Sequence, residues 1–299
     1  MTKKVLAIYF SQSGQLGEII DNFTAPIAGP GVTIEKVSVK LPNPYPFPWK
    51  GNTFFAVMPD CVLSVPTALV PFQLKEKQYD LIILGYQAWF LSPSIPFNSI
   101  LNSASVKAVL RDTPVIMITG ARNMWITAFE KSKKILANTG AKLAAHIALV
   151  DKHANFVSFV TIFYWMLKGK KGRALNIFPM PGVSEKDIAG AGLFGEIVAR
   201  HLKKADLMGL QSELVDNKAV EIKYSLMFIE SKASRIFSIW AKIIAKKKNK
   251  GFWLNLFKYY LIIALFVAAP IILTVDFIFF KPFSRKRIAA RKQHLLGVN

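Results

Sequence analysis

One stretch near the beginning of the chain constrains the fold more than any other. Val5–Phe10 is a short run of apolar, β-branched and aromatic residues, of the kind that forms a strand buried on both faces. The polar turn Ser11–Gln15 follows, and a helical pattern of apolar residues begins at Leu16. The stretch therefore predicts a strand that passes through a hydroxyl- and glycine-rich turn directly into a helix.

The turn has the chemistry of a phosphate cradle. A phosphate at this junction would meet free backbone N–H groups, the positive end of a helix dipole and the hydroxyls of Ser11 and Ser13. The turn contains no lysine or arginine, so it suits a phosphate monoester better than a triphosphate with magnesium. It matches neither the P-loop nor the dinucleotide fingerprint. The alternative is that the serines only cap the helix.

Four further strands are predicted, and helices alternate with them. The strands are Val32–Val39, Tyr79–Gly85, Pro114–Thr119 and Lys142–Val150. Helices are expected over 96–110, 126–138 and 185–204. Five strands alternating with helices at these spacings predict an α/β fold with a doubly wound, five-stranded parallel sheet.

Ligands of such sheets bind outside the carboxyl ends of the strands, near the point where the winding reverses. Three predicted loops meet there: Ser11–Gln15, Gly85–Ser92 and Gly120–Trp125. The second and third begin with glycine and carry aromatic residues that could approach a flat ligand closely, namely Tyr86, Trp89 and Trp125. The alternative is that these aromatic residues belong to the core or the rim.

The first loop resembles that of the flavodoxin family, which reads Thr/Ser-x-Thr/Ser-Gly-x-Thr and wraps the phosphate of FMN. Ser11, Ser13 and Gly14 match, and Leu16 stands in place of the last hydroxyl. The resemblance implies a flavodoxin-like strand order and FMN as the cofactor. The residues that it assigns to FMN are Ser11, Gln12, Ser13, Gly14, Gln15, Leu16, Gly85, Tyr86, Gln87, Ala88, Trp89, Gly120, Arg122, Asn123 and Trp125.

A proline- and aromatic-rich block carries a narrower resemblance. Pro44-Tyr-Pro-Phe-Pro-Trp49 and Phe54-Phe55-x-x-Met58-Pro59, together with Gly85–Ser94 and Arg122–Trp125, resemble the flavodoxin-type family of dialkylresorcinol biosynthesis, whose members are often labelled dialkylresorcinol condensing enzymes. The resemblance implies that a ketosynthase-like partner makes a 2,5-dialkylcyclohexane-1,3-dione. The flavodoxin-type protein would then oxidise this lipophilic substrate to the aromatic resorcinol, as an FMN-dependent dehydrogenase or aromatase.

Such an oxidation removes a proton next to a carbonyl and a hydride from the neighbouring carbon, so it needs a flavin and a base. Arg122 is the candidate for stabilising an enolate oxygen or the reduced flavin, with a surface arginine as the alternative. Tyr86 is the candidate proton relay and His153 the candidate base. His146 falls inside a predicted strand and is interpreted as a core histidine.

The proline-rich segment can be neither helix nor central strand. Its neighbourhood, residues 41–60, is expected to form an apolar lid for alkyl chains. The lid residues are Tyr45, Phe47, Trp49, Phe54 and Phe55. Alternatively, the prolines could be displayed to a partner domain as a polyproline II ligand.

Charge and cysteine content limit the partners. The net charge is +21, and the residues from Ala241 onward hold twelve Lys and Arg against one acid, Asp276. Basic charge beside apolar sequence favours an anionic membrane surface over nucleic acid. A single cysteine, Cys61, excludes an intrachain disulfide and indicates a reducing compartment. The four histidines are scattered, so no metal site is expected.

The last third of the chain predicts membrane attachment. A basic amphipathic helix is expected over 224–248, and seventeen uncharged residues follow over Tyr259–Val275. Because basic clusters flank this segment on both sides, a hairpin bent at Pro270 is preferred over a single span, and packing of the segment in a wholly soluble fold is the third alternative. The expected location is the cytoplasmic face of the inner membrane.

The predicted organisation is a flavodoxin-like domain over residues 1–208, with an insertion over 151–182, and a membrane-associating extension over 209–299. Two other classes of function remain open. The chain could be a membrane-anchored electron carrier of the flavodoxin type, or a non-catalytic scaffold that recruits the ketosynthase.

Overall fold

A computed structural model describes residues 2–298. Within them, five parallel strands form the central sheet, in the order β2-β1-β3-β6-β7. This is the flavodoxin-like order, with the winding reversed between β1 and β3, so the predicted fold class is confirmed. The strands are β1 (Lys3–Tyr9), β2 (Val32–Ser38), β3 (Leu81–Tyr86), β6 (Pro114–Ala121) and β7 (Lys142–Val150).

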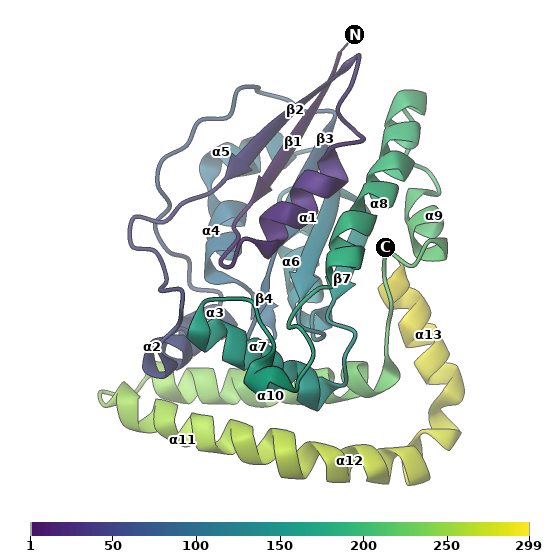
Figure 1. Ribbon diagram of the computed structural model, residues 1–299. Helices are drawn as coiled ribbons and strands as arrows, with labels where there is room; N and C mark the ends of the chain where they lie inside the picture. Colours follow the sequence, from purple (N-terminus) through teal and green to yellow (C-terminus); the bar gives the residue numbers. More distant parts are fainter. Residues whose placement is uncertain (1, 299) are drawn as a thin grey trace.

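Helices cover both faces of the sheet (Figure 1). Helices α1 (Gln15–Thr24) and α8 (Glu185–Lys204) lie on one face, and α4 (Ile95–Asn102), α5 (Ala104–Leu110) and α6 (Ile126–Ala137) lie on the other. Since successive strand residues point to opposite faces, each strand contributes to two apolar cores. The helix predicted over 96–110 is two helices, because Ser103 has an extended backbone and begins α5 as its N-cap.

The segment after residue 208 packs against the sheet. Helix α9 (Leu210–Asp216) packs beside β7, and Leu210 and Leu214 are buried in the core. The N–H of Ala148 in β7 donates to the carbonyl of Ala219 at 2.8 Å. This segment therefore covers the free edge of β7.

A cap of short elements closes the carboxyl end of the sheet. It contains α2 (Gly51–Ala56), α3 (Met58–Val62), the antiparallel pair β4 (Ala88–Trp89) and β5 (Ser92–Pro93), and α7 (Asn155–Lys168). The 3₁₀ turn η1 (Ala174–Asn176) follows α7. As predicted, the proline-rich residues 41–49 form neither helix nor strand.

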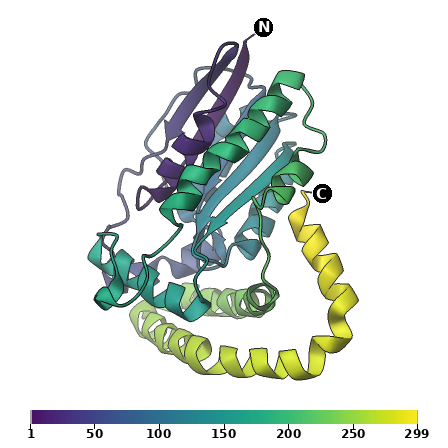
Figure 2. The same cartoon turned by 45° about the vertical axis from the view of Figure 1, so that its right-hand side comes forward.

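The C-terminal extension passes beneath this cap (Figures 1 and 2). Helix α10 (Tyr224–Ala245) leads into α11 (Lys250–Ile263), which continues through η2 (Ala264–Ala268), α12 (Ala269–Val275) and η3 (Asp276–Phe280). After the turn η4 (Pro282–Ser284), α13 (Arg285–Leu296) returns to the α/β domain. There, the carbonyl of Leu296 accepts a hydrogen bond from Gln211 Nε2 at 2.7 Å.

The predicted hairpin at Pro270 is wrong. Residues Lys250–Phe280 form one helix of 31 residues, and it runs alongside α10 rather than folding back at the proline. Proline removes one backbone N–H, but the π-helical turn of η2 immediately precedes it. Such a local change of hydrogen-bond register lets a helix continue past a proline.

Candidate functional site

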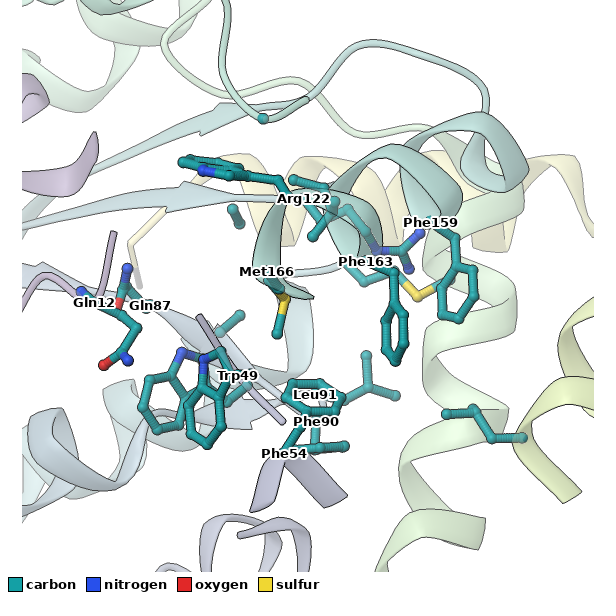
Figure 3. A pocket seen from close by; sticks show the side chains of 18 of the residues that line it. Gln12, Trp49, Phe54, Gln87, Phe90, Leu91, Arg122, Phe159, Phe163 and Met166 are labelled. Atoms are coloured by element: carbon teal, nitrogen blue, oxygen red, sulfur yellow. The ribbon is translucent and has the colours of Figure 1, made fainter. Parts of the chain in front are cut away.

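A cavity of about 310 Å³ lies at the carboxyl ends of the strands, between the sheet, the cap and the C-terminal extension. All three predicted loops contribute to its wall, and so do α7, α10 and the long helix Lys250–Phe280. Figure 3 shows glutamine side chains at one side of this space and phenylalanine, leucine and methionine side chains around the rest. The size and the mainly apolar lining are those of a small-molecule site.

The first loop presents Gln12, Ser13 and Gln15 to the cavity. Ser11 instead turns its hydroxyl toward α1, where it accepts from the N–H of Gly17 at 3.4 Å, so this serine has the capping role that was the alternative. The hydroxyl of Ser13 makes no hydrogen bond within residues 2–298 and lies beside the amino end of α1. Ser13 is therefore the serine that remains available for a bound anion.

The glutamines of this loop hold its shape. The N–H of Gln12 donates to Gln87 Oε1 at 3.3 Å, which links the first and second loops. Nε2 of Gln12 also donates to the carbonyl of Tyr45 at 3.1 Å. The cradle is thus fixed to the second loop and to the proline-rich segment, while Gly14 (φ +90°) supplies the turn.

Sequence reasoning missed Gly182 and Val183, which close the cradle from the far side. Val183 exchanges two hydrogen bonds with the side chain of Gln15, and Gly182 lines the cavity. A Cβ at Gly182 (φ +80°) would lie 2.9 Å from Gln15 Oε1 and 3.0 Å from a ring carbon of Trp165. The Pro181-Gly182 pair marks a turn in the sequence, and this signal could have identified them.

The two strand-end glycines have a different role from the predicted one. A Cβ at Gly85 would lie 2.7 Å from the Cβ of Tyr9, and one at Gly120 would lie 2.8 Å from Cδ1 of Ile19. Both glycines therefore make room for side chains on the α1 face of the sheet. The predicted role, which was to let the backbone approach a flat ligand closely, is therefore not the reason for glycine at these positions. Gly120 nevertheless lines the cavity.

Tyr86 and Trp125 are buried in the core behind the site and do not line the cavity. The hydroxyl of Tyr86 lies 2.9 Å from His146 Nε2, and the imidazole stacks on Phe129. Burial lowers the pKa of His146 to about 3, so its ring is neutral. The core role predicted for His146 is confirmed, and the enclosed position of Tyr86 argues against its predicted role as a proton relay.

Arg122 lies on the cavity wall, as the sequence predicted. Its Nη1 donates to the side-chain oxygen of Asn155 at 2.8 Å and to the carbonyl of Asn155 at 3.1 Å. Burial lowers the pKa of the guanidinium to about 10, and the carboxylates of Asp151 and Glu230 oppose that shift. Arg122 is therefore a fixed cation at neutral pH, with the ring of Phe159 5.9 Å away.

His153 is not brought to the cavity. Its side chain is 42% exposed, and Nδ1 lies 2.6 Å from Asp151 Oδ1. The other oxygen of that buried carboxylate accepts from Ser158 at 2.8 Å. This position argues against His153 as the base.

Asn123, beside Arg122, is buried, and neither polar atom of its side chain has a partner within the described chain.

Three of the five predicted lid residues reach the cavity: Phe47, Trp49 and Phe54. Tyr45 and Phe55 support them from behind, since Tyr45 stacks on Trp49 with ring centroids 5.7 Å apart. The lid packs on the second loop through Trp89 and Phe90, and on α7 through Phe163. In the second loop, Gln87, Ala88 and Trp89 all line the cavity, as do Leu16 and Gly120 of the predicted set.

Glu230 on α10 was not predicted. It is 1% exposed, its Oε1 accepts from the N–H of Thr127 at 2.6 Å, and its Oε2 has no partner within residues 2–298. Burial raises the pKa of this carboxyl to about 7. Glu230 thus joins the C-terminal extension to the start of α6, just after the third loop. In the sequence it is the only acid between Glu221 and Asp276.

Among the residues that the structure describes, no three His, Cys, Asp or Glu side chains form a group that could hold a metal ion.

No family model matches the chain, and no curated protein matches it.

Several solved structures of flavoproteins are similar in fold. An FMN-bound flavoprotein of Lactobacillus acidophilus has 16% identity and a TM-score of 0.39, covering 49% of this chain and 91% of that one. Oxidised flavodoxin 1 of Bacillus cereus has 14% identity and a TM-score of 0.36, covering 67% and 99%. A flavone reductase has 12% identity and a TM-score of 0.35, covering 67% and 63%. The fold assignment itself rests on the strand order.

Proposed function

We propose that this protein is an FMN-dependent oxidoreductase that acts on a lipophilic substrate at a membrane. The observation that carries the proposal is the cavity itself, which joins the loop at the amino end of α1 to an aromatic chamber with the half-buried guanidinium of Arg122. Neither feature alone defines a redox site. Together they provide separate places for a phosphate and for a flat ring.

The residues present fit FMN. The hydroxyl of Ser13 and the backbone N–H groups at the start of α1 would hold the phosphate, with Gln15 fixed beside them. Gln87 and Trp89, which line the cavity, would border the ring. When bound, the flavin would supply hydride acceptance.

The finer proposal concerns the substrate, and it is supported by the resemblance of the proline- and aromatic-rich block described above. The substrate would be a 2,5-dialkylcyclohexane-1,3-dione supplied by a ketosynthase partner. Its oxidation removes one hydride and one proton and yields the resorcinol. Arg122 would stabilise the enolate oxygen, and the aromatic lid of Trp49 and Phe54 would exclude water.

The long helix supports attachment to a membrane. Within residues 2–298, Lys250–Phe280 is the one helix long and apolar enough to cross a bilayer, and 11% of its most apolar window is buried. It lies along the base of the domain beside α10 (Figure 1), with Lys246–Lys248 before it and Arg285–Arg287 after it. We propose an in-plane anchor on the cytoplasmic face, because a crossing in this orientation would draw α10 and its exposed lysines into the hydrocarbon.

The test is an absorbance spectrum of detergent-purified protein, followed by anaerobic addition of a 2,5-dialkylcyclohexane-1,3-dione. We expect released FMN after denaturation, bleaching of the flavin bands and one resorcinol per flavin. Bound FMN that the dione does not reduce would instead favour the electron carrier. A protein that cannot be loaded with FMN would leave only the scaffold.

A further inference from the structure

The cavity has an apolar arm that extends away from the first loop into the C-terminal helices. Ile229, Ala233 and Phe237 of α10 form one side of this arm, one helical turn apart. Leu261, Ala264 and Ala269 of the long helix contribute to the other side. None of these side chains offers a hydrogen bond, and Tyr260 carries the one hydroxyl among the lining residues of the two helices, so the arm suits a mainly apolar ligand.

The wall formed by the long helix is one helix thick. Residues 261, 264, 265 and 269 line the cavity, whereas Ile263, Val267 and Ile271 point away from the domain and are 59%, 53% and 58% exposed. The exposed residues belong to the face that we assign to the membrane. The arm therefore ends one helix away from the surface that the proposed anchor would place against lipid.

The width of the arm is set by small residues. Ala233 on α10 faces the cavity, as do Ala264 and Ala269 on the long helix, and larger side chains such as Phe159 and Phe237 lie around them. An alanine leaves room where a leucine or phenylalanine would project several further carbon atoms into the space. This is the wall composition expected for a narrow apolar ligand.

We propose that this arm is the binding site for one alkyl chain of the substrate, and that Ala233 and Ala264 limit the chain length it accepts. The inference rests on the proposed function. It places the principal surface for binding the alkyl chain on the helices of the anchor. The sequence had suggested the proline-rich lid instead. The polar end of the cavity at Gln12 and Ser13 stays free for the cofactor.

The test uses Ala264→Phe, which fills the arm, and Val267→Phe, which adds the same ring to the outward face of the same helix. Binding of alkylresorcinols with methyl, hexyl and dodecyl chains, each brominated on the ring, is measured in nanodiscs by quenching of tryptophan fluorescence. We expect Ala264→Phe to raise the apparent Kd of the dodecyl compound at least tenfold. The methyl compound should change little, and Val267→Phe should stay within about twofold of wild type.

Ala233→Leu places a larger side chain in the same arm from α10. It is a second test in case Ala264→Phe does not fold. It should give the same dependence on chain length. Equal effects of the variants at positions 264 and 267, or equal weakening of short and long chains, would overturn the proposal. The FMN content of each preparation is recorded separately, so a protein without FMN would refute the redox function while chain binding is still measured.

Discussion

Gln15 and Val183 are joined by two hydrogen bonds, one from Gln15 Nε2 to the carbonyl of Val183 at 3.2 Å and one from the N–H of Val183 to Gln15 Oε1 at 3.1 Å. The pair ties the loop after β1 to the residues just before α8, which are far apart in the sequence. It fixes the side chain next to the amino end of α1. A small change at Gln15 therefore tests the anion site directly.

We expect Gln15→Glu to weaken FMN binding at least tenfold. The carboxylate keeps the acceptor for the Val183 N–H but loses the donor to its carbonyl, and it places a negative charge beside the phosphate position. Equilibrium dialysis against FMN measures the effect. Gln15→Met, which removes the hydrogen bonds without adding charge, is the control and should weaken binding less. Equal losses in the two variants would mean that no anion binds there.

Replacing the two strand-end glycines by alanine should destabilise the fold to different extents. At Gly85 the new Cβ would meet the Cβ of Tyr9, which cannot move without the strand, and we expect a loss of about 1–3 kcal/mol in the free energy of unfolding. At Gly120 it would meet the flexible end of Ile19, and the loss should be smaller. Urea denaturation gives both values, and the reverse order would refute this account.

Arg122→Gln should lower the turnover number for the dione by about a hundredfold or more, because a fixed cation beside a developing enolate is lost. FMN content should stay near that of wild type. Asn155→Ala, which removes the side-chain oxygen that holds the guanidinium, should lower turnover by less. The control is Arg111→Gln, which changes an exposed arginine before the amino end of β6, whereas Arg122 follows the carboxyl end of the same strand. A similar loss in that variant would contradict a specific role for Arg122.

The sequence predicted the sheet well, because buried parallel strands are continuous apolar runs and their carboxyl ends must meet. That argument brought Ser13, Gln87, Trp89 and Arg122 to one cavity. It could not predict which way a side chain at a strand end would point. Tyr86 was therefore assigned to the site, whereas in the structure it is buried in the core.

The sequence pattern also could not predict that the last third of the chain contributes to the wall of the cavity. Apolar residues such as Phe237 and Leu265 could be assigned to lipid or to the domain with equal ease, since both environments exclude water. Only the packing of α10 and the long helix beneath the cap shows that one face of each lines the cavity.

Glu230 gives a prediction about pH. Its pKa is raised from 4.5 to about 7 in the folded protein, so the folded state binds a proton more tightly than the unfolded state does. The free energy of unfolding should therefore fall as pH rises from about 4.5 to 7. Above about pH 7 the ionisation of Glu230 should cause no further decrease. A shift of this size corresponds to about 3 kcal/mol.

The variant Glu230→Gln isolates this contribution, because the amide oxygen can still accept from the N–H of Thr127. We expect it to match wild type near pH 4.5 and to be more stable by about 1–3 kcal/mol at pH 8, where wild type must keep a buried carboxylate charged. Urea denaturation in the same detergent at several pH values measures the difference. If the difference were constant across this range, Glu230 would be ionised normally, and its burial on α10 would not be coupled to protonation.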